Sequence, residues 1–316
     1  MSTAVNLARR AAAARADSAE CGVALQALAA HLKSFRKVAA AEVLRAAPEV
    51  LHTCVRRGDG AALAVVEMLA LVKEDNAVMV RTTGLVEWLL REAAGAGATK
   101  ARAMGVLGTL AIVEENAVPM LAVSGLAETL MRAADKGETS EVKEEGLRTL
   151  ANLAYAVDNK VPMFATPGLV KLLTRAGDKG ETSEAKQWGL LALANLAAAE
   201  DNAVLMFAKP GLMEVLMRAA GKDEASEIKR EGLRALANLA CAEDNKVPMF
   251  AKPGLVEVLM HAGDNGETNE IKLQGLKALY ILALADGNKA PMVRKKGVVR
   301  SLMQAAAAVA PNADAQ

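Results

Sequence analysis

The stretch GLRTLANLA, residues 146–154, decides the fold because it returns along the chain. It recurs as GLLALANLA at 189–197, GLRALANLA at 232–240 and GLKALYILA at 275–283, a constant step of 43 residues. A helical sequence repeated at this period is typical of a solenoid, in which each unit packs only against its neighbours. We therefore predict an all-α solenoid rather than a globular domain with one central core.

Each repeat is predicted to contain one short helix and two longer ones. In the unit that begins at Asn245, KVPMFA (246–251) forms the short helix, with Asn245 as its N-cap. Lys-Pro-Gly at 252–254 separates it from a second helix, LVEVLMHA (255–262). Asn269 is then predicted to cap the third helix, which runs through IKLQGLKALYILALA (271–285).

Several other residue types keep the same step, and we assign them structural roles. Gly in the middle of a helix costs roughly 0.5–1 kcal/mol relative to Ala, so the Gly column predicts a close helix approach. The N-cap assignment extends to Asn116, Asn159, Asn202 and Asn288. Core positions are predicted for two further columns: Met163, Met206, Met249 and Met292, and Phe164, Phe207 and Phe250.

Composition and motifs exclude several classes of function. A net charge of +1 argues against a dedicated nucleic-acid binder. The three histidines, His31, His52 and His261, match no metal-ligand spacing, and no nucleotide-binding or hydrolase motif is present. We therefore expect no catalytic residues, no metal and no cofactor. The three cysteines are predicted to be reduced core thiols: Cys21, Cys54 and Cys241.

The N-terminal segment 1–17 carries three arginines before its first acidic residue, Asp17. This is a weak organelle-targeting pattern, but we favour the alternative of a frayed, Ala-rich first helix. No segment resembles a membrane span or a secretory signal. We expect a cytoplasmic protein, with a nuclear one as the alternative.

The repeated segments resemble the armadillo repeat. The resemblance rests on LRTLANLA (147–154), LLALANLA (190–197) and LRALANLA (233–240), together with PGLVKLL (167–173) and PGLVEVL (253–259). It implies a right-handed superhelix of about six repeats over residues 58–304. An N-terminal cap at 1–57 and a disordered tail at 305–316 complete the expected organisation.

The same resemblance implies where a ligand binds. In such proteins the third helices line a concave face, and an extended peptide commonly runs along it. The Asn of the repeated motif projects into this groove and hydrogen-bonds the peptide backbone. The matching positions here are Asn152, Asn195 and Asn238.

Helical geometry supports this placement. At about 100° per residue, Asn152 falls opposite the apolar side formed by Leu147 and Leu150. Three outward columns result: Thr109, Asn152, Asn195, Asn238 and Ile281; Gly105, Arg148, Leu191, Arg234 and Lys277; and Arg102, Glu145, Trp188, Glu231 and Gln274.

Two of these columns leave alternatives open. Arg148, Arg234 and Lys277 suit an acidic or phosphorylated ligand. The alternative is that Glu145–Arg148 and Glu231–Arg234 neutralise each other as i,i+3 pairs. Trp188 is either an anchor for the ligand or a ring that covers neighbouring residues.

We therefore predict a non-catalytic scaffold or adaptor that binds an extended, acidic or phosphorylated peptide in the groove. The expected partner is a protein or peptide, not nucleic acid, without membrane insertion, and the chain itself is expected to be a monomer. The alternative is an assembly protein that associates through its convex face or its Ala-rich ends, such as SLMQAAAAVA at 301–310.

Overall fold

The computed structural model describes residues 2–95 and 97–309, and every regular element among them is a helix. The chain divides into two compact units, Met1–Asn159 (unit 1) and Lys160–Gln316 (unit 2). The division that we expected after residue 57 therefore falls inside unit 1.

Unit 1 begins with four helices and continues with two three-helix repeats. The first four are α1 (Thr3–Ala13), α2 (Ala19–Ala46), α3 (Val50–Arg57) and α4 (Gly60–Ala70). The repeats are α5 (Ala77–Arg81), α6 (Leu85–Ala94) and α7 (Ala98–Leu110), then α8 (Glu114–Leu121), α9 (Leu126–Lys136) and α10 (Ser140–Leu153). A short 3-10 helix, η1 (Val157–Asn159), follows. In unit 1, α7 packs between α4 and α10.

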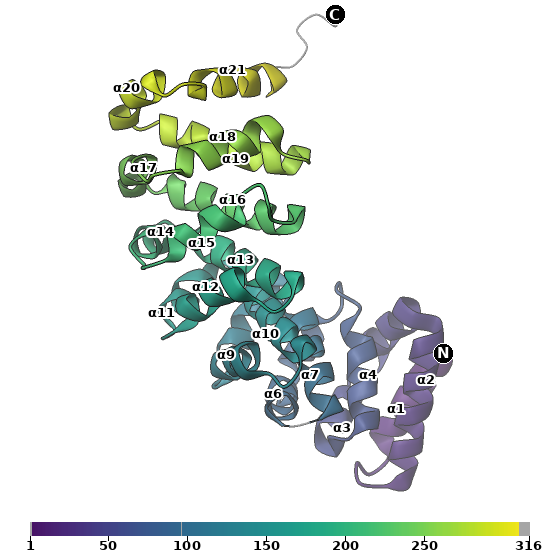
Figure 1. The fold of residues 1–316 in the computed structure, drawn as a ribbon. Helices are drawn as coiled ribbons and strands as arrows, with labels where there is room; N and C mark the ends of the chain where they lie inside the picture. The colour runs from purple at the N-terminus through teal and green to yellow at the C-terminus, as the bar shows by residue number, and fades with distance from the viewer. Residues whose placement is uncertain (1, 96, 310–316) are drawn as a thin grey trace, which may run out of the picture. The chain divides into compact units, whose positions relative to one another are not determined.

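Unit 2 contains three complete repeats and a terminal pair of helices (Figure 1). The repeats are α11 (Lys160–Ala165), α12 (Leu169–Lys179) and α13 (Ser183–Leu196); α14 (Glu200–Phe207), α15 (Leu212–Ala219) and α16 (Ser226–Cys241); and α17 (Glu243–Phe250), α18 (Leu255–Asn265) and α19 (Asn269–Ala283). They are followed by α20 (Asp286–Arg294) and α21 (Val298–Val309). The third helices again pack in succession, α13 against α16 and α16 against α19. The predicted pattern of one short and two longer helices is confirmed except in the α14–α16 repeat, where α14 and α15 each have 8 residues.

Glycine has two separate tasks in each repeat. Gly254 lies between the first and second helices with φ +83°, a left-handed conformation that L side chains rarely adopt. Gly232 lies inside α16, where a Cβ atom would come within 2.9 Å of the Ala219 Cβ and 3.0 Å of the Ala220 nitrogen. The predicted close approach of a neighbouring helix is confirmed at this column.

The Asn column at 116, 159, 202, 245 and 288 is buried, but Asn116, Asn202, Asn245 and Asn288 are not the N-caps that we predicted. Asn245 lies in the first turn of α17, whose N-cap is Ala242. Its Nδ2 donates to the Leu239 carbonyl at 2.9 Å and to the Ala203 carbonyl at 3.0 Å. The side chain thus ties the start of α17 to two helices of the preceding repeat, the end of α16 and the short helix α14. Asn159, Asn202 and Asn288 make the same two kinds of bond.

The N-caps of the third helices lie one residue earlier than predicted. Thr268 caps α19, because its hydroxyl accepts from the Ile271 nitrogen at 3.2 Å, and Asn269 is the first residue of the helix. Thr139 and Thr182 cap α10 and α13 in the same way. Ala225 occupies this position before α16 and provides no side-chain cap.

The core columns are confirmed only in part. Met163, Met206, Met249 and Met292 are buried. The Phe column is half-exposed instead, and the ammonium group of Lys209 lies 5.6 Å from the centre of the Phe164 ring.

The cysteines also depart from the prediction. Cys21 and Cys54 are buried, and burial raises the pKa of the Cys54 thiol. Cys241, the last residue of α16, is exposed, so it is not the core thiol that we expected.

The chain ends bear on two further expectations. Helix α1 is capped by Ser2 and buries Ala4, Val5, Ala8 and Ala11, so it is a packed helix and not a frayed one. Helix α21 continues to Val309, into the predicted disordered tail, and residues 310–316 lie outside the described part of the chain. Among the described residues, no helix by itself has the length and apolar composition needed to span a bilayer. Among these residues, only α13 and α14 taken together reach that length and composition, and this pair is bent by 120°.

Candidate functional site

The outward columns of the third helices form two surfaces, one in each unit. The third-helix face of unit 1 consists of Arg102, Gly105 and Thr109 on α7 with Glu145, Arg148 and Asn152 on α10. The third-helix face of unit 2 consists of Trp188, Leu191 and Asn195 on α13, Glu231, Arg234 and Asn238 on α16, and Gln274, Lys277 and Ile281 on α19. Because successive third helices pack side by side within a unit, each face continues from one repeat to the next.

Two of the three motif asparagines are half-buried and anchored to the preceding repeat. The Nδ2 of Asn238 donates to the Ala194 carbonyl at 2.8 Å, and the Nδ2 of Asn152 donates to the Gly108 carbonyl at 2.9 Å. An Asn amide has two N–H donors and an acceptor oxygen, so each anchored amide keeps one N–H and its oxygen. Among the described residues, no partner occupies the Oδ1 atom of either side chain.

Asn195 does not lie open in a groove, which corrects the expectation for this residue. Its side chain is only 3% exposed. The Nη2 of Arg234, one repeat later, donates to the Asn195 Oδ1 at 2.9 Å. A long side chain from the next repeat therefore covers the amide, which the repeat pattern alone does not reveal.

The charged side chains of unit 2 largely neutralise one another. Glu231 is buried, and its Oε1 accepts from the Arg230 Nε at 2.8 Å. Its Oε2 lies 3.6 Å from the Arg234 Nη1 and is buried without a hydrogen-bond donor among the described residues. Lys277 is exposed on α19. Arg234 is thus paired through Glu231, and Lys277 is left as the exposed cation of this face.

Arg148 is paired in the same manner in unit 1. Its guanidinium group forms an ion pair with Glu145, and its Nη2 also donates to the Gly105 carbonyl at 3.1 Å. Thr109 donates to the same carbonyl at 2.8 Å. Arg148 and Arg234 thus each form the i,i+3 pair with a glutamate, so neither guanidinium group is an open anion site.

The apolar residues of the unit 2 face differ in exposure. Trp188 and Leu191 are half-exposed on α13, one turn apart, whereas Ile281 is 9% exposed. An exposed indole beside an aliphatic side chain is a common anchoring surface for a protein ligand. The partial burial of Trp188 accommodates both roles, an anchor for a ligand and a ring that covers Gly189.

Among the described residues, no group of three or more His, Cys, Asp or Glu side chains could hold a metal ion. The two faces present amide groups, paired charges and a few apolar side chains. Sequence reasoning missed the Gly108 and Ala194 carbonyls that orient the amides, because backbone acceptors carry no residue-type signal.

Comparison with known proteins gives a fold but no close relative. No protein-family model matches the chain, and no curated protein sequence matches it. A designed armadillo repeat protein is 16% identical with a TM-score of 0.59, over 88% of this chain and 98% of that one. A computationally designed armadillo protein for modular peptide recognition is 17% identical with a TM-score of 0.63, over 73% of this chain and 98% of that one.

A natural protein is also similar. The UNC-45 chaperone is 16% identical with a TM-score of 0.60, over 83% of this chain and 30% of that one. These likenesses show that the chain has an armadillo-like repeat fold, as the repeated motif predicted.

Proposed function

We propose that this chain is a non-catalytic protein-interaction scaffold that binds an extended segment of a partner protein along the third-helix face of a unit. The observation that carries the proposal is the anchored, half-exposed amide of Asn238, with its counterpart Asn152 in unit 1. An amide held by one N–H in a fixed orientation can bond a peptide unit without reorganising, which lowers the entropic cost of binding. Backbone recognition of this kind is indifferent to side-chain sequence.

The adjoining side chains supply selectivity. In unit 2, Trp188 and Leu191 offer apolar contact area, and Lys277 offers a positive charge. A preference for acidic or phosphorylated segments rests on Lys277, because Arg148 and Arg234 are already paired with glutamates. Structural neighbours include a designed armadillo repeat protein in complex with the peptide (KR)4 and a set designed for modular peptide recognition.

The proposal is tested with a library of random twelve-residue peptides displayed on phage and selected on the purified full chain. Affinities of the enriched peptides are then measured by fluorescence anisotropy for the wild type, Asn238→Ala and Asn265→Ala. Asn265 is an exposed residue at the end of α18 and serves as the matched control. We expect Asn238→Ala to weaken binding about fivefold or more, the equivalent of one hydrogen bond, with no change for the control.

Helical content and thermal midpoint, followed by circular dichroism, verify that both variants fold. Equal affinity of the wild type and Asn238→Ala for every enriched peptide would reject backbone recognition at this face.

One surface favours self-association as a second candidate function. Helix α2 exposes Val23, Phe35 and Val38 by 61%, 62% and 72%, and the His31 ring lies against that of Phe35, with ring centres 4.4 Å apart and planes tilted by 31°. Exposed apolar residues gathered on one helix are typical of a protein contact. Light scattering during size exclusion distinguishes the two functions: a dimer that dissociates in Phe35→Glu supports assembly, whereas a monomer at high concentration rejects it.

A further inference from the structure

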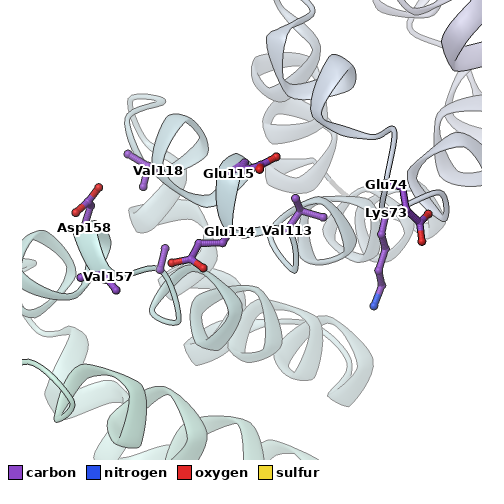
Figure 2. Close-up of a pocket in the computed structure, with 9 residues that line it drawn as sticks. Lys73, Glu74, Val113, Glu114, Glu115, Val118, Val157 and Asp158 are labelled. Carbon is purple, nitrogen blue, oxygen red and sulfur yellow. The ribbon is translucent and has the colours of Figure 1, made fainter.

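Unit 1 contains a cavity of about 640 Å³ on a different part of the repeats, where α7 and α10 end and the next short helices begin. Figure 2 shows its walls, with Val157 and Asp158 on one side, Val113 and Glu114 in the middle, and Lys73 and Glu74 on the other. A cavity of this volume lies within the usual range for ligand pockets, about 300–1,000 Å³.

Part of the cavity wall is apolar and exposed. Val157 is 66% exposed and Val118 is 40% exposed, and Val113 and Ala156 also belong to the lining. The neighbouring Tyr155 is 57% exposed. A single exposed Val needs no explanation, but several apolar side chains around one hollow indicate a surface that another molecule covers.

The rest of the wall is acidic. The lining has a formal charge of −3, because it contains one ammonium group, that of Lys73, and four carboxylates, those of Glu74, Glu114, Glu115 and Asp158. Glu74 lies within electrostatic reach of Arg45. Within residues 2–95 and 97–309, no ion pair or hydrogen bond engages the side chains of Glu114, Glu115 or Asp158.

The repeats of unit 2 provide an internal comparison. In α17 and α20, Lys246 pairs with Glu243 and Lys289 pairs with Asp286, each from one turn further along the same helix, whereas α14 has Ala203 at the equivalent position. The corresponding position in α8 is Ala117, which cannot neutralise Glu114.

Carboxylates at the start of α8 also stabilise the helix dipole, which by itself accounts for their place in the first turn. That effect does not account for the cavity or for the exposed valines beside it.

We propose that this cavity docks a basic, apolar segment of a partner protein, independently of the third-helix faces. Arg or Lys head groups of the segment pair with Glu114, Glu115 and Asp158, and an adjacent aliphatic side chain packs on Val118 and Val157. Arg suits the site better than Lys, because a guanidinium group pairs bidentately with a carboxylate. The apolar wall gives the site a hydrophobic contact in addition to its charge, because a purely ionic attraction would not require the exposed valines.

The test uses three fluorescein-labelled twelve-residue peptides of alternating sequence, Arg-Leu, Arg-Ser and Glu-Leu, titrated with the full chain and followed by anisotropy. We expect the Arg-Leu peptide to bind, the Arg-Ser peptide to bind about fivefold more weakly or worse, and the Glu-Leu peptide not to bind. Raising the salt concentration weakens the Arg-Leu complex without abolishing its preference over Arg-Ser.

Two variants with the same change in net charge locate the site. Glu114→Gln/Glu115→Gln/Asp158→Asn is expected to weaken Arg-Leu binding about tenfold or more. Glu141→Gln/Glu184→Gln/Glu227→Gln, which alters three exposed carboxylates at the starts of third helices, is expected to leave it unchanged. Val157→Ser removes exposed apolar surface and should weaken Arg-Leu binding while sparing Arg-Ser.

Equal losses in the two charge variants, or equal affinities for Arg-Leu and Arg-Ser, would overturn the proposal. Asn238→Ala separates it from the proposed function, because the cavity proposal requires that this variant keep wild-type affinity for the Arg-Leu peptide.

Discussion

Arg234 donates a hydrogen bond from Nη2 to Oδ1 of Asn195 at 2.9 Å, so a side chain of one repeat covers the motif amide of the repeat before it. Asn195 is 3% exposed as a result. In the following repeat, Lys277 occupies the position equivalent to Arg234 and is exposed to solvent, so Asn238 stays half-exposed. Equivalent positions in successive repeats therefore present different chemistry.

Removal of the Arg234 guanidinium group should destabilise unit 2. Arg234→Ala leaves the Asn195 oxygen without its donor and leaves buried Glu231 with Arg230 alone. An unsatisfied buried acceptor costs about 1–3 kcal/mol, so the urea midpoint followed by fluorescence should fall. Arg294→Ala, at an exposed position of α20, is the matched control and should change the midpoint little. A midpoint equal to that of the control would contradict this role for Arg234.

The buried asparagine column should be less tolerant than any exposed asparagine. Asn245→Ala leaves the carbonyls of Leu239 and Ala203 without a donor, at a cost of roughly 2–5 kcal/mol, whereas Asn265→Ala should stay within about 0.5 kcal/mol. Asn245→Asp should be worse at neutral pH, since a carboxylate would face two carbonyl oxygens.

The aspartate variant also has a defined pH dependence. Burial would raise the folded-state pKa of the new carboxyl group, so the protein would be more stable at low pH and lose stability as pH rises through that pKa. The thermal midpoint of Asn245→Asp is measured at pH 4 and pH 7, and the change in the wild-type midpoint between these two pH values is subtracted. The remaining change gives the sign of the pH dependence.

Two glycines in third helices should respond oppositely to alanine. At Gly232 a Cβ would meet Ala219 at 2.9 Å, so Gly232→Ala should destabilise the protein by about 1–3 kcal/mol. At Gly105 the nearest atom, the Glu145 Oε2, would be 3.9 Å away. Gly105→Ala should therefore stabilise the helix by roughly 0.5–1 kcal/mol. Denaturation midpoints that move in the same direction for both would show that the close approach is not the cause.

Acid should weaken the ion pairs that join neighbouring repeats of unit 2. Hydrogen bonds from Lys252 and Lys295 lower the pKa of Glu214 and Glu257 below the ordinary 4.5. A lowered folded-state pKa gives stability that is present above pH 4.5 and is lost as pH falls. Because both carboxylates are more than half exposed, solvent screening limits each pair to a few tenths of a kcal/mol. Lys252→Met/Lys295→Met should therefore show a smaller fall in thermal midpoint between pH 7 and pH 3 than the wild type.

The repeat period was sufficient to predict the helix pattern and the close helix approach at Gly232. The sequence also predicted correctly that Asn245 has a structural role, but the predicted hydrogen-bond partner, an amide of the next helical turn, was wrong. N-capping is a local rule that relates a residue to the next turn, whereas the actual acceptors are carbonyls 6 and 42 residues earlier. Both belong to the preceding repeat, and only the stacking of repeats brings the Ala203 carbonyl within reach.

The candidate site was less predictable for the same reason. A helical wheel places Asn195 and Asn238 on one face, but the reach of Arg234 from the next repeat decides that only Asn238 stays open. The trace that the cavity in unit 1 leaves in the sequence is weak, because Ala117 stands at the position of Lys246 and Lys289 but Ala203 occupies the same position in α14. That substitution has a meaning only once the hollow beside it is known.

The most direct test of the third-helix face is a nuclear magnetic resonance titration of the isotope-labelled chain with a library-selected peptide. Side-chain signals report on the site itself: the indole N–H of Trp188 and the amide group of Asn238. The account predicts that both shift progressively and saturate together with the backbone signals of α16 and α19. Saturable shifts confined to the second helices α12, α15 and α18, with Trp188 and Asn238 unmoved, would contradict it.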